Sequence, residues 1–339
     1  MAWSPAVAAV VVVLTTAAIW KGSDWLESSS ERLSRYYGLP PVVQGSVVVA
    51  IGSSFPELAS VVVAALEGSV ALGVGAIVGS AIFNVLVIPA AAGLATATPV
   101  ESNRTLVYKE AQFYMLAVST LLITFAFAVI YVPGTAPLTG SVTRPLALIP
   151  LGLYALYLFI QYQDTAEYVA DPAEARGVDP LRQWAFLAAG LLVILVAVEN
   201  LVHAVRVLGS TFGVSEFVLG VVIVAGATSL PDTLVSVRAA RAGRGVTSLA
   251  NVLGSNTFDL LVAIPVGVLI AGPALIDFAV AAPMFGVLTA ATVLLFTVMR
   301  TDLSLDDREA AALLGCYVVF VAWVVAETVG VGPGLLPVS

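Results

Sequence analysis

Apolar stretches of about 20 residues, each long enough to cross a hydrocarbon core roughly 30 Å thick, recur along the whole chain. The chain is 60% hydrophobic and only 11% charged, whereas a soluble globular domain carries about 25% charged residues. It therefore cannot cover its surface with polar groups, and we predict an integral membrane protein whose main surroundings are a lipid bilayer. The formal net charge of -8 offers no basic surface, so we expect no nucleic-acid partner.

Apolar runs, read against charge and turn clusters, predict an all-α protein with ten transmembrane spans. We place them near residues 3–20, 40–66, 70–98, 110–132, 144–161, 183–205, 214–240, 246–271, 274–299 and 309–329. The longest hydrophilic stretch lies in the middle of the chain and separates five spans from five. We therefore expect a first repeat at residues 1–162, a cytoplasmic linker at 163–181 and a second repeat at 182–339.

The positive charges set the expected orientation, because cytoplasmic loops keep an excess of Lys and Arg. When the loops are alternated between the two sides, twelve of the fourteen Lys and Arg residues fall on one side, and only Arg144 and Arg206 fall on the other. This bias predicts that both termini lie outside the cell.

An internal repeat appears at an offset of 175 residues. GSSFPELAS at 52–60 matches ATSLPDTLV at 227–235, and GSAIFN at 79–84 matches GSNTFD at 254–259. Five spans separate equivalent positions, and five is odd, so the second copy crosses the membrane upside down. Inverted repeats are typical of secondary transporters, whose substrate sites lie near the midplane.

Each copy places an acid directly after a proline inside an apolar span, Glu57 after Pro56 and Asp232 after Pro231. A charged side chain at the membrane centre costs at least about 2.5–3.5 kcal/mol, so such residues usually have a function. A proline inside a helix also frees the carbonyl four residues earlier, here that of Gly52 or Ala227. Together with Ser53, Ser54, Thr228 and Ser229, these groups form a set of hard oxygen ligands suited to Na+ and Ca2+.

The second motif of each copy adds Asn84 and Asp259, each 27 residues beyond the first acid. Small residues let membrane helices pack closely, and we interpret Gly73, Gly75 and Gly79 in this way. The absence of Cys and His from these motifs argues against zinc or copper. The predicted metal ligands are Glu57, Asp232, Asp259, Asn84, Ser53, Ser54, Ser80, Thr228, Ser229 and Ser255.

The motifs GSSFPE, IVGSAIFN, ATSLPD and GSNTFD resemble the alpha repeats of the cation/Ca2+ exchanger superfamily, and the ten-span layout resembles its prokaryotic Na+/Ca2+ exchangers. The resemblance implies a secondary active antiporter in the plasma membrane of a prokaryote. Such a protein is not an enzyme, needs no cofactor, and exchanges Na+ for Ca2+ by alternating access as two gating helices slide over a fixed core. It further implies that Glu57 and Asp232 bridge the Ca2+ and Na+ sites, with the other predicted ligands around or close to them.

The sequence also departs from the resemblance, since Ala76 and Ala81 stand where many relatives carry Asn, and Asp232 where many carry Glu. Asp232 and GSNTFD also resemble the potassium-dependent branch of the superfamily. The alternatives are therefore a K+-dependent Na+/Ca2+ exchanger and a Ca2+/H+ exchanger. An intramembrane aspartyl enzyme built on Asp232 and Asp259 is disfavoured, because the chain lacks a GxGD motif and such an enzyme has no use for Glu57.

Overall fold

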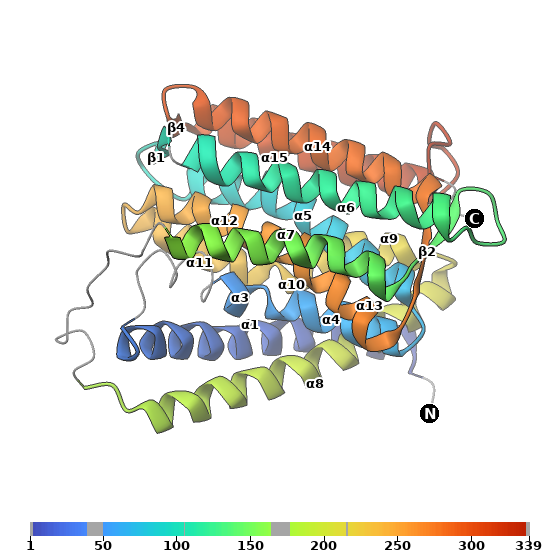
Figure 1. The fold of residues 1–339 in the computed structure, drawn as a ribbon, viewed down its shortest axis with the longest axis horizontal. Helices are drawn as coiled ribbons and strands as arrows, with labels where there is room; N and C mark the ends of the chain where they lie inside the picture. Colours follow the sequence, from blue (N-terminus) through green and yellow to red (C-terminus); the bar gives the residue numbers. More distant parts are fainter. Residues whose placement is uncertain (1–2, 39–49, 105, 164–176, 215, 337–339) are drawn as a thin grey trace.

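The computed structural model describes residues 3–38, 50–104, 106–163, 177–214 and 216–336, and this part of the chain is helical apart from four short strands (Figure 1). The helical elements before the predicted linker are α1 (Pro5–Tyr36), α3 (Ala50–Ser53), α4 (Phe55–Leu66), α5 (Val70–Leu94), the π-helical η2 (Leu106–Glu110), α6 (Ala111–Tyr131) and α7 (Arg144–Gln163). Those after it are α8 (Pro180–Phe212), α9 (Glu216–Leu219), the π-helical η3 (Gly220–Val224), α10 (Ala225–Thr228), α11 (Leu230–Arg241), α12 (Gly245–Phe258), the π-helical η4 (Asp259–Ala263), α13 (Ile264–Ala271), α14 (Phe278–Arg300) and α15 (Asp307–Thr328).

Eight helices of the described part are long and apolar enough to cross a bilayer. A ninth crossing results if Glu216–Thr228 and Leu230–Arg241, which meet at a 44° bend, form one broken span. The all-helical prediction is confirmed. The predicted second span is described only from Ala50, because residues 40–49 lie outside the described residues, as do 164–176 of the predicted linker.

The first predicted span, 3–20, is too short, because α1 continues to Tyr36. Charged residues made the segment after residue 20 look like a loop, but they pair along the helix at i+3 and i+4 spacing. Lys21 Nζ lies 3.0 Å from Asp24 Oδ2, and Arg35 Nη2 lies 3.8 Å from Glu31 Oε1. Asp24 therefore lies inside α1.

The sixth predicted span, 183–205, is also exceeded, because α8 runs to Phe212 and encloses Glu199. Both α1 and α8 begin with a proline after a capping side chain. Ser4 Oγ accepts a hydrogen bond from the Val7 amide, and the Asp179 carboxylate accepts one from the Arg182 amide. Both starts follow the usual chemistry of a helix N-terminus.

The order of elements repeats along the chain at the spacing seen in the sequence. The pairs α1 and α8, α3 and α10, α4 and α11, and α5 and α12 each begin 175 residues apart. In both copies the helix breaks at the serine two residues before the proline, at Ser54 and Ser229.

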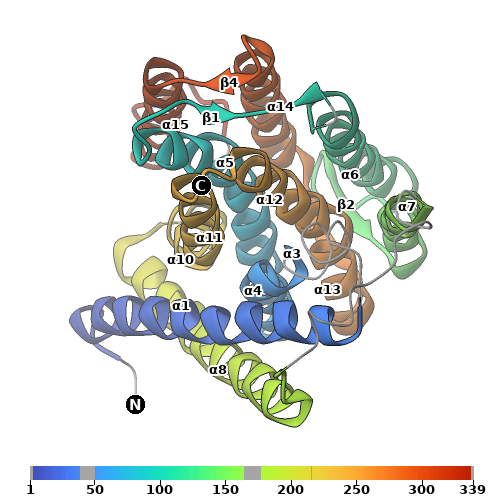
Figure 2. The ribbon, with the colours of Figure 1, turned by 90° about the vertical axis from the view of Figure 1, so that its left-hand side faces the viewer.

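Two long elements form the centre of the bundle. In the most apolar stretch of each span, 83% of the residues in α5 and 78% of those in α12–α13 are buried. The corresponding shares are 28% in α1 and 33% in α8. Figure 2 shows α1 and α8 as a layer along one side of the remaining helices. The pair contacts the core through α3, α4, α10 and α11 among other elements.

The four strands form two antiparallel pairs at opposite ends of the molecule (Figure 1). The strand β1 (Val100–Glu101) pairs with β4 (Ser304–Leu305), and β2 (Thr139–Val142) pairs with β3 (Ala274–Asp277). The start of α1 and the end of α15 lie at the end that carries β2 (Figure 1).

Glycines bring the two copies into contact. A Cβ atom added at Gly75 or Gly79 of α5 would collide with the backbone of Phe217 or Val221, and one at Gly220 would collide with the backbone of Leu72. A Cβ at Gly73 would lie 3.3 Å from the Cα of Val61. The packing role predicted for Gly73, Gly75 and Gly79 is confirmed.

Candidate ion-binding site

The two broken helices place the two predicted acids at equivalent positions. A proline has no N–H group, so it fits the first turn of a new helix and not the interior of a continuous one. Glu57 lies in the first turn of α4 and Asp232 in the first turn of α11. The partial positive charge at a helix N-terminus favours a carboxylate there.

Glu57 is 1% exposed, and its Oε1 atom accepts hydrogen bonds from side chains of both copies. Ser229 Oγ lies 3.1 Å and Ser80 Oγ lies 3.5 Å from this oxygen. The two hydroxyl oxygens lie 2.7 Å from each other. A side chain of the second copy therefore helps to hold the carboxylate of the first.

Asp232 is fully buried and is held in a related way. Ser255 Oγ donates to its Oδ1 at 3.1 Å, and Asn84 Nδ2 donates to its Oδ2 at 3.4 Å. Ser53 Oγ lies 3.4 Å from Ser255 Oγ. Hydrogen bonds thus connect seven of the ten predicted ligands into two polar groups, one around each acid.

Three predicted ligands are buried but take no part in these bonds. Thr228 donates its hydroxyl to its own helix, at 3.0 Å from Val224 O and 3.3 Å from Ala225 O. Ser54 Oγ and both carboxylate oxygens of Asp259 have no hydrogen-bond partner within the described residues. Asp259 lies near Ser54, Glu57 and Asp232.

Unpartnered oxygens are the clearest chemical feature of this region. Besides those of Ser54 and Asp259, Glu57 Oε2 and Asn84 Oδ1 also have no partner among the described residues. A buried polar atom without a partner costs free energy, so native proteins rarely leave several together. Carboxylate, amide and hydroxyl oxygens are the donors that Na+ and Ca2+ prefer, and the residues therefore fit a hard cation as substrate.

The described part of the chain contains no group of three or more His, Cys, Asp or Glu side chains placed to hold a metal ion. Glu57, Asp232 and Asp259 are thus not a compact carboxylate cluster. An ion bound between them needs hydroxyl, amide and backbone oxygens as well. This mixture is typical of alkali and alkaline-earth ions and unlike a zinc site.

Two residues of the network were missed in the sequence. Asn256 Oδ1 accepts from Asn84 Nδ2 at 3.0 Å, while its own Nδ2 donates to Tyr114 Oη and to Ala81 O, both at 3.1 Å. Asn256 lies within GSNTFD, at the position equivalent to Ala81 of the first copy. This difference between the two copies could have identified Asn256 from the sequence. Tyr114 comes from α6, outside both motifs, and nothing in the sequence marks it.

Comparison with known proteins agrees with this architecture. The model of the family described as "Sodium/calcium exchanger protein" matches residues 7–163 and 182–326. CaxA of Alkalimonas amylolytica, a candidate antiporter by its name, is 30% identical over 285 residues, which cover 82% of this chain and 84% of CaxA. The sodium/calcium exchanger MaX1 of Methanosarcina acetivorans is 25% identical over 281 residues, covering 74% of this chain and 79% of MaX1.

A solved structure of the sodium-calcium exchanger NCX_Mj, soaked with 10 mM Na+ and zero Ca2+, has the same fold. The TM-score is 0.65 at 21% identity, over 94% of this chain and 99% of that one. The family match covers most of the sequence and both copies of the repeat. The chain therefore belongs to the sodium/calcium exchanger protein family, a family of membrane transporters and not of enzymes.

Proposed function

We propose that this protein is a secondary active antiporter that exchanges Na+ for Ca2+ by alternating access. The observation that carries the proposal is the pair Glu57 and Asp232, two buried carboxylates at the breaks of two inverted helices, each held by hydroxyls. Free oxygens of Glu57, Asn84, Ser54 and Asp259 lie in the same buried region. Na+ and Ca2+ both bind such oxygens, so the two ions can compete for one site.

In this mechanism Glu57 and Asp232 provide the charge that draws a dehydrated cation into the membrane. Ser53, Ser54, Ser80, Thr228, Ser229 and Ser255 provide neutral oxygens, and Asn84 and Asp259 complete the set. The layer of α1 and α8 moves over the core and opens the site to one side at a time. The transported ions Na+ and Ca2+ are the substrates, and the mechanism needs no cofactor.

The names of the relatives bear on which ion is coupled to Ca2+ transport. MaX1 is named a sodium/calcium exchanger. Human sodium/potassium/calcium exchanger 5 is 43% identical, but over only 61 residues, or 18% of this chain. Both names include sodium, which favours Na+ as the coupling ion, and the longer similarity favours an exchanger that does not need K+. K+ dependence and proton coupling are the alternatives that a transport assay separates.

We further propose ten spans with both termini outside, formed by a repeat at 1–162, a cytoplasmic linker at 163–181 and a repeat at 182–339. The strand pairs support this count. Six proposed spans lie between β1 and β4, and four lie between β2 and β3. Both numbers are even, so the two strands of each pair lie on the same side of the membrane. We place the protein in the plasma membrane of a prokaryote.

Transport into sealed vesicles tests the coupling ion. Purified protein is reconstituted into proteoliposomes loaded with Na+, and uptake of radioactive Ca2+ is compared with uptake into Na+-free vesicles that carry only a pH gradient. We expect uptake that requires the outward Na+ gradient. Uptake that follows the pH gradient and ignores Na+ would move the protein to the Ca2+/H+ class.

A further inference from the structure

Arg206 connects three helices at one end of the molecule. It lies near the end of α8, where its Nη1 atom is 3.1 Å from Glu67 Oε2 and its Nε atom is 3.3 Å from Glu216 Oε1. Glu67 is the C-cap of α4, and Glu216 is the first residue of α9. The buried Ser69 donates its hydroxyl to the same oxygen of Glu216 at 3.2 Å. One guanidinium group therefore holds α8 against one helix from each copy of the repeat.

Both of these helices lead to the candidate ion-binding site. Glu57 lies in the first turn of α4, and α9 continues through η3 and α10 to the break that precedes Asp232. Glu57 is 1% exposed and Asp232 is 0% exposed, so the two acids are closed off in this arrangement. Arg206 thus joins the layer of α1 and α8 to the two elements that carry the site.

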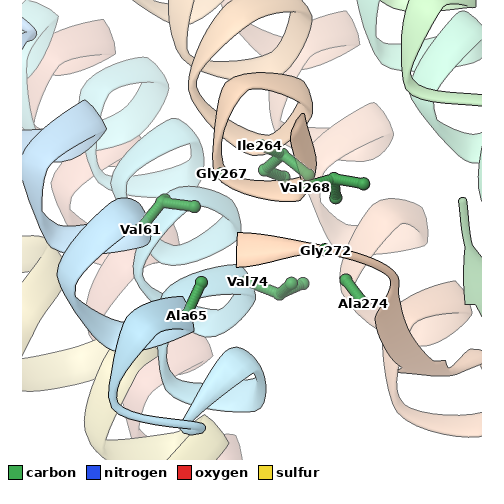
Figure 3. Close-up of a pocket in the computed structure, with 8 residues that line it drawn as sticks. All are labelled: Val61, Ala65, Val74, Ile264, Gly267, Val268, Gly272 and Ala274. Atoms are coloured by element: carbon green, nitrogen blue, oxygen red, sulfur yellow. The ribbon is translucent and has the colours of Figure 1, made fainter. Parts of the chain in front are cut away.

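The other contacts of α8 with this end of the core are apolar. Val198, Val202 and Val205 belong to a buried cluster that also includes Leu72 and Ala227. Toward the same end, α4 faces α13 across a narrow crevice (Figure 3). Its lining is apolar throughout: Val61, Ala65, Val74, Ile264, Gly267, Val268, Gly272 and Ala274. Apolar attraction has no preferred direction, whereas an ion pair fixes the relative position of the groups that it joins.

The arrangement is not repeated in the other copy. A glutamate, an alanine and a proline stand at the equivalent positions 31, 242 and 41. The helix α1 meets α11 through Asp24 Oδ1 and Arg238 Nη1, which lie 3.6 Å apart, and 59% of the Arg238 side chain is exposed. The connection made by Arg206 is closer and involves two carboxylates.

We propose that Arg206, Glu67 and Glu216 form an ionic latch that holds α8 in the position that closes the site, and that the latch opens during transport. Its ion pairs are partly exposed, with 38% of the Arg206 side chain accessible, and such pairs are individually weak. Thermal motion can therefore open the latch. The part that it plays in transport rests on the proposed function, whereas its effect on the position of α8 does not.

Labelling of a single cysteine tests the latch without any transport. Cys316 is the only cysteine, so Cys316→Ser gives the background. Val202 is 0% exposed and lies one turn before Arg206, and Val202→Cys therefore reports separation of α8 from the core. In purified protein in detergent, we expect Arg206→Gln to raise the rate of labelling of Val202→Cys by an uncharged thiol reagent roughly three- to ten-fold, because both ion pairs are lost. Labelling of Val118→Cys, a position that is 1% exposed in α6, should not change.

Matched variants separate the latch from a general effect of charge. Arg144→Gln removes the other basic residue of the proposed outer side and should leave the labelling of Val202→Cys unchanged. Glu67→Gln combined with Glu216→Gln should raise labelling as much as Arg206→Gln does, and adding Arg206→Gln to that pair should have no further effect. An unchanged rate in Arg206→Gln, an equal rise in Arg144→Gln or at Val118→Cys, or an additive effect of the three changes would each overturn the proposal.

Side-specific transport gives a second readout. The latch lies on the proposed outer side, so Arg206→Gln should increase the fraction of protein that is open to the outside. The outer Ca2+ concentration for half-maximal transport should then fall by up to the same three- to ten-fold, with no change in Arg144→Gln. An unchanged or higher value in Arg206→Gln would contradict the role of the latch in transport. A wild type that does not exchange Na+ for Ca2+ would refute the proposed function and leave the labelling result intact.

Discussion

Glu57 and Asp232 are stabilised by hydroxyl or amide donors and by a helix N-terminus, and in the described part of the chain no basic side chain hydrogen-bonds to either acid. Glu57 bonds to two serines, and Asp232 to Ser255 and Asn84. Hydroxyls donate one hydrogen but keep lone pairs, so they can hold the carboxylate and still ligate a cation. A basic partner would instead compete with the transported ion.

Removing either charge should abolish exchange. We expect Glu57→Gln and Asp232→Asn each to lower Na+-driven Ca2+ transport by about a hundred-fold or more, because a dehydrated cation loses close-range attraction in a low dielectric. Both proteins should remain folded, since an amide is cheaper to bury than a carboxylate. Transport into proteoliposomes measures the effect, and Glu199→Gln, which changes an exposed carboxylate on α8, is the control that should keep full activity. Substantial transport by Glu57→Gln or Asp232→Asn would refute the site.

Asp259 is the position at which the two copies differ in charge, since its counterpart is Asn84. If all three acids were ionised, a bound Ca2+ would leave one negative charge uncompensated. We predict that a proton or a water path, and not K+, accounts for it. Transport by the wild type should then be indifferent to K+, and Asp259→Asn should keep Ca2+ binding while its pH dependence flattens. A K+ requirement in the wild type, lost in Asp259→Asn, would contradict this prediction.

The candidate ligands that the sequence predicted and the structure brings together are those that stand out chemically or repeat. Glu57 and Asp232 are acids in apolar spans, and the serines beside them recur in the second copy, so periodicity and burial cost were enough. Asn256 could have been noted from its contrast with Ala81, but Tyr114 was missed for a physical reason. Its role depends on how α6 packs against α12, and a hydrogen bond between distant helices leaves no local pattern.

At the scale of elements, the helices fall where the apolar runs predict them, while their ends do not. In its part beyond residue 20, α1 carries ion pairs along the helix and packs against α8, and hydropathy measures neither feature. The 44° bend before α11 was foreseeable, because Pro231 cannot donate the hydrogen bond of a straight helix.

The glycine contact between α5 and η3 gives an element-scale prediction. Gly79→Ala should lower the free energy of unfolding by about 1–3 kcal/mol, because the added methyl meets the backbone of Val221, which cannot move aside. Gly286→Ala, in α14, adds the same methyl where nothing lies within 4 Å, and helix propensity favours it by about 1 kcal/mol. Melting of the two proteins in detergent compares them. Equal melting temperatures would show that the close approach of α5 and η3 is not needed.

At the scale of the whole molecule, the two antiparallel strand pairs link loops that belong to different copies. Long-range pairing of this kind was not predictable from hydropathy. It agrees with the assignment of loops to alternate sides of the membrane that was based on Lys and Arg. The arrangement predicts that both termini lie outside the cell. Short epitope tags at each terminus should be cleaved by protease in intact cells, and a tag in the 163–181 segment should be cleaved only after permeabilisation. Protection of either terminal tag in intact cells would contradict the orientation.

We propose that Na+ and Ca2+ bind in turn to one buried site that contains both Glu57 and Asp232. Equilibrium binding of radioactive Ca2+ to purified protein, titrated with Na+ at constant ionic strength, is the test. We expect saturable Ca2+ binding that Na+ displaces completely and that Asp232→Asn lacks. Ca2+ binding that persists at saturating Na+, or that Asp232→Asn retains unchanged, would contradict it.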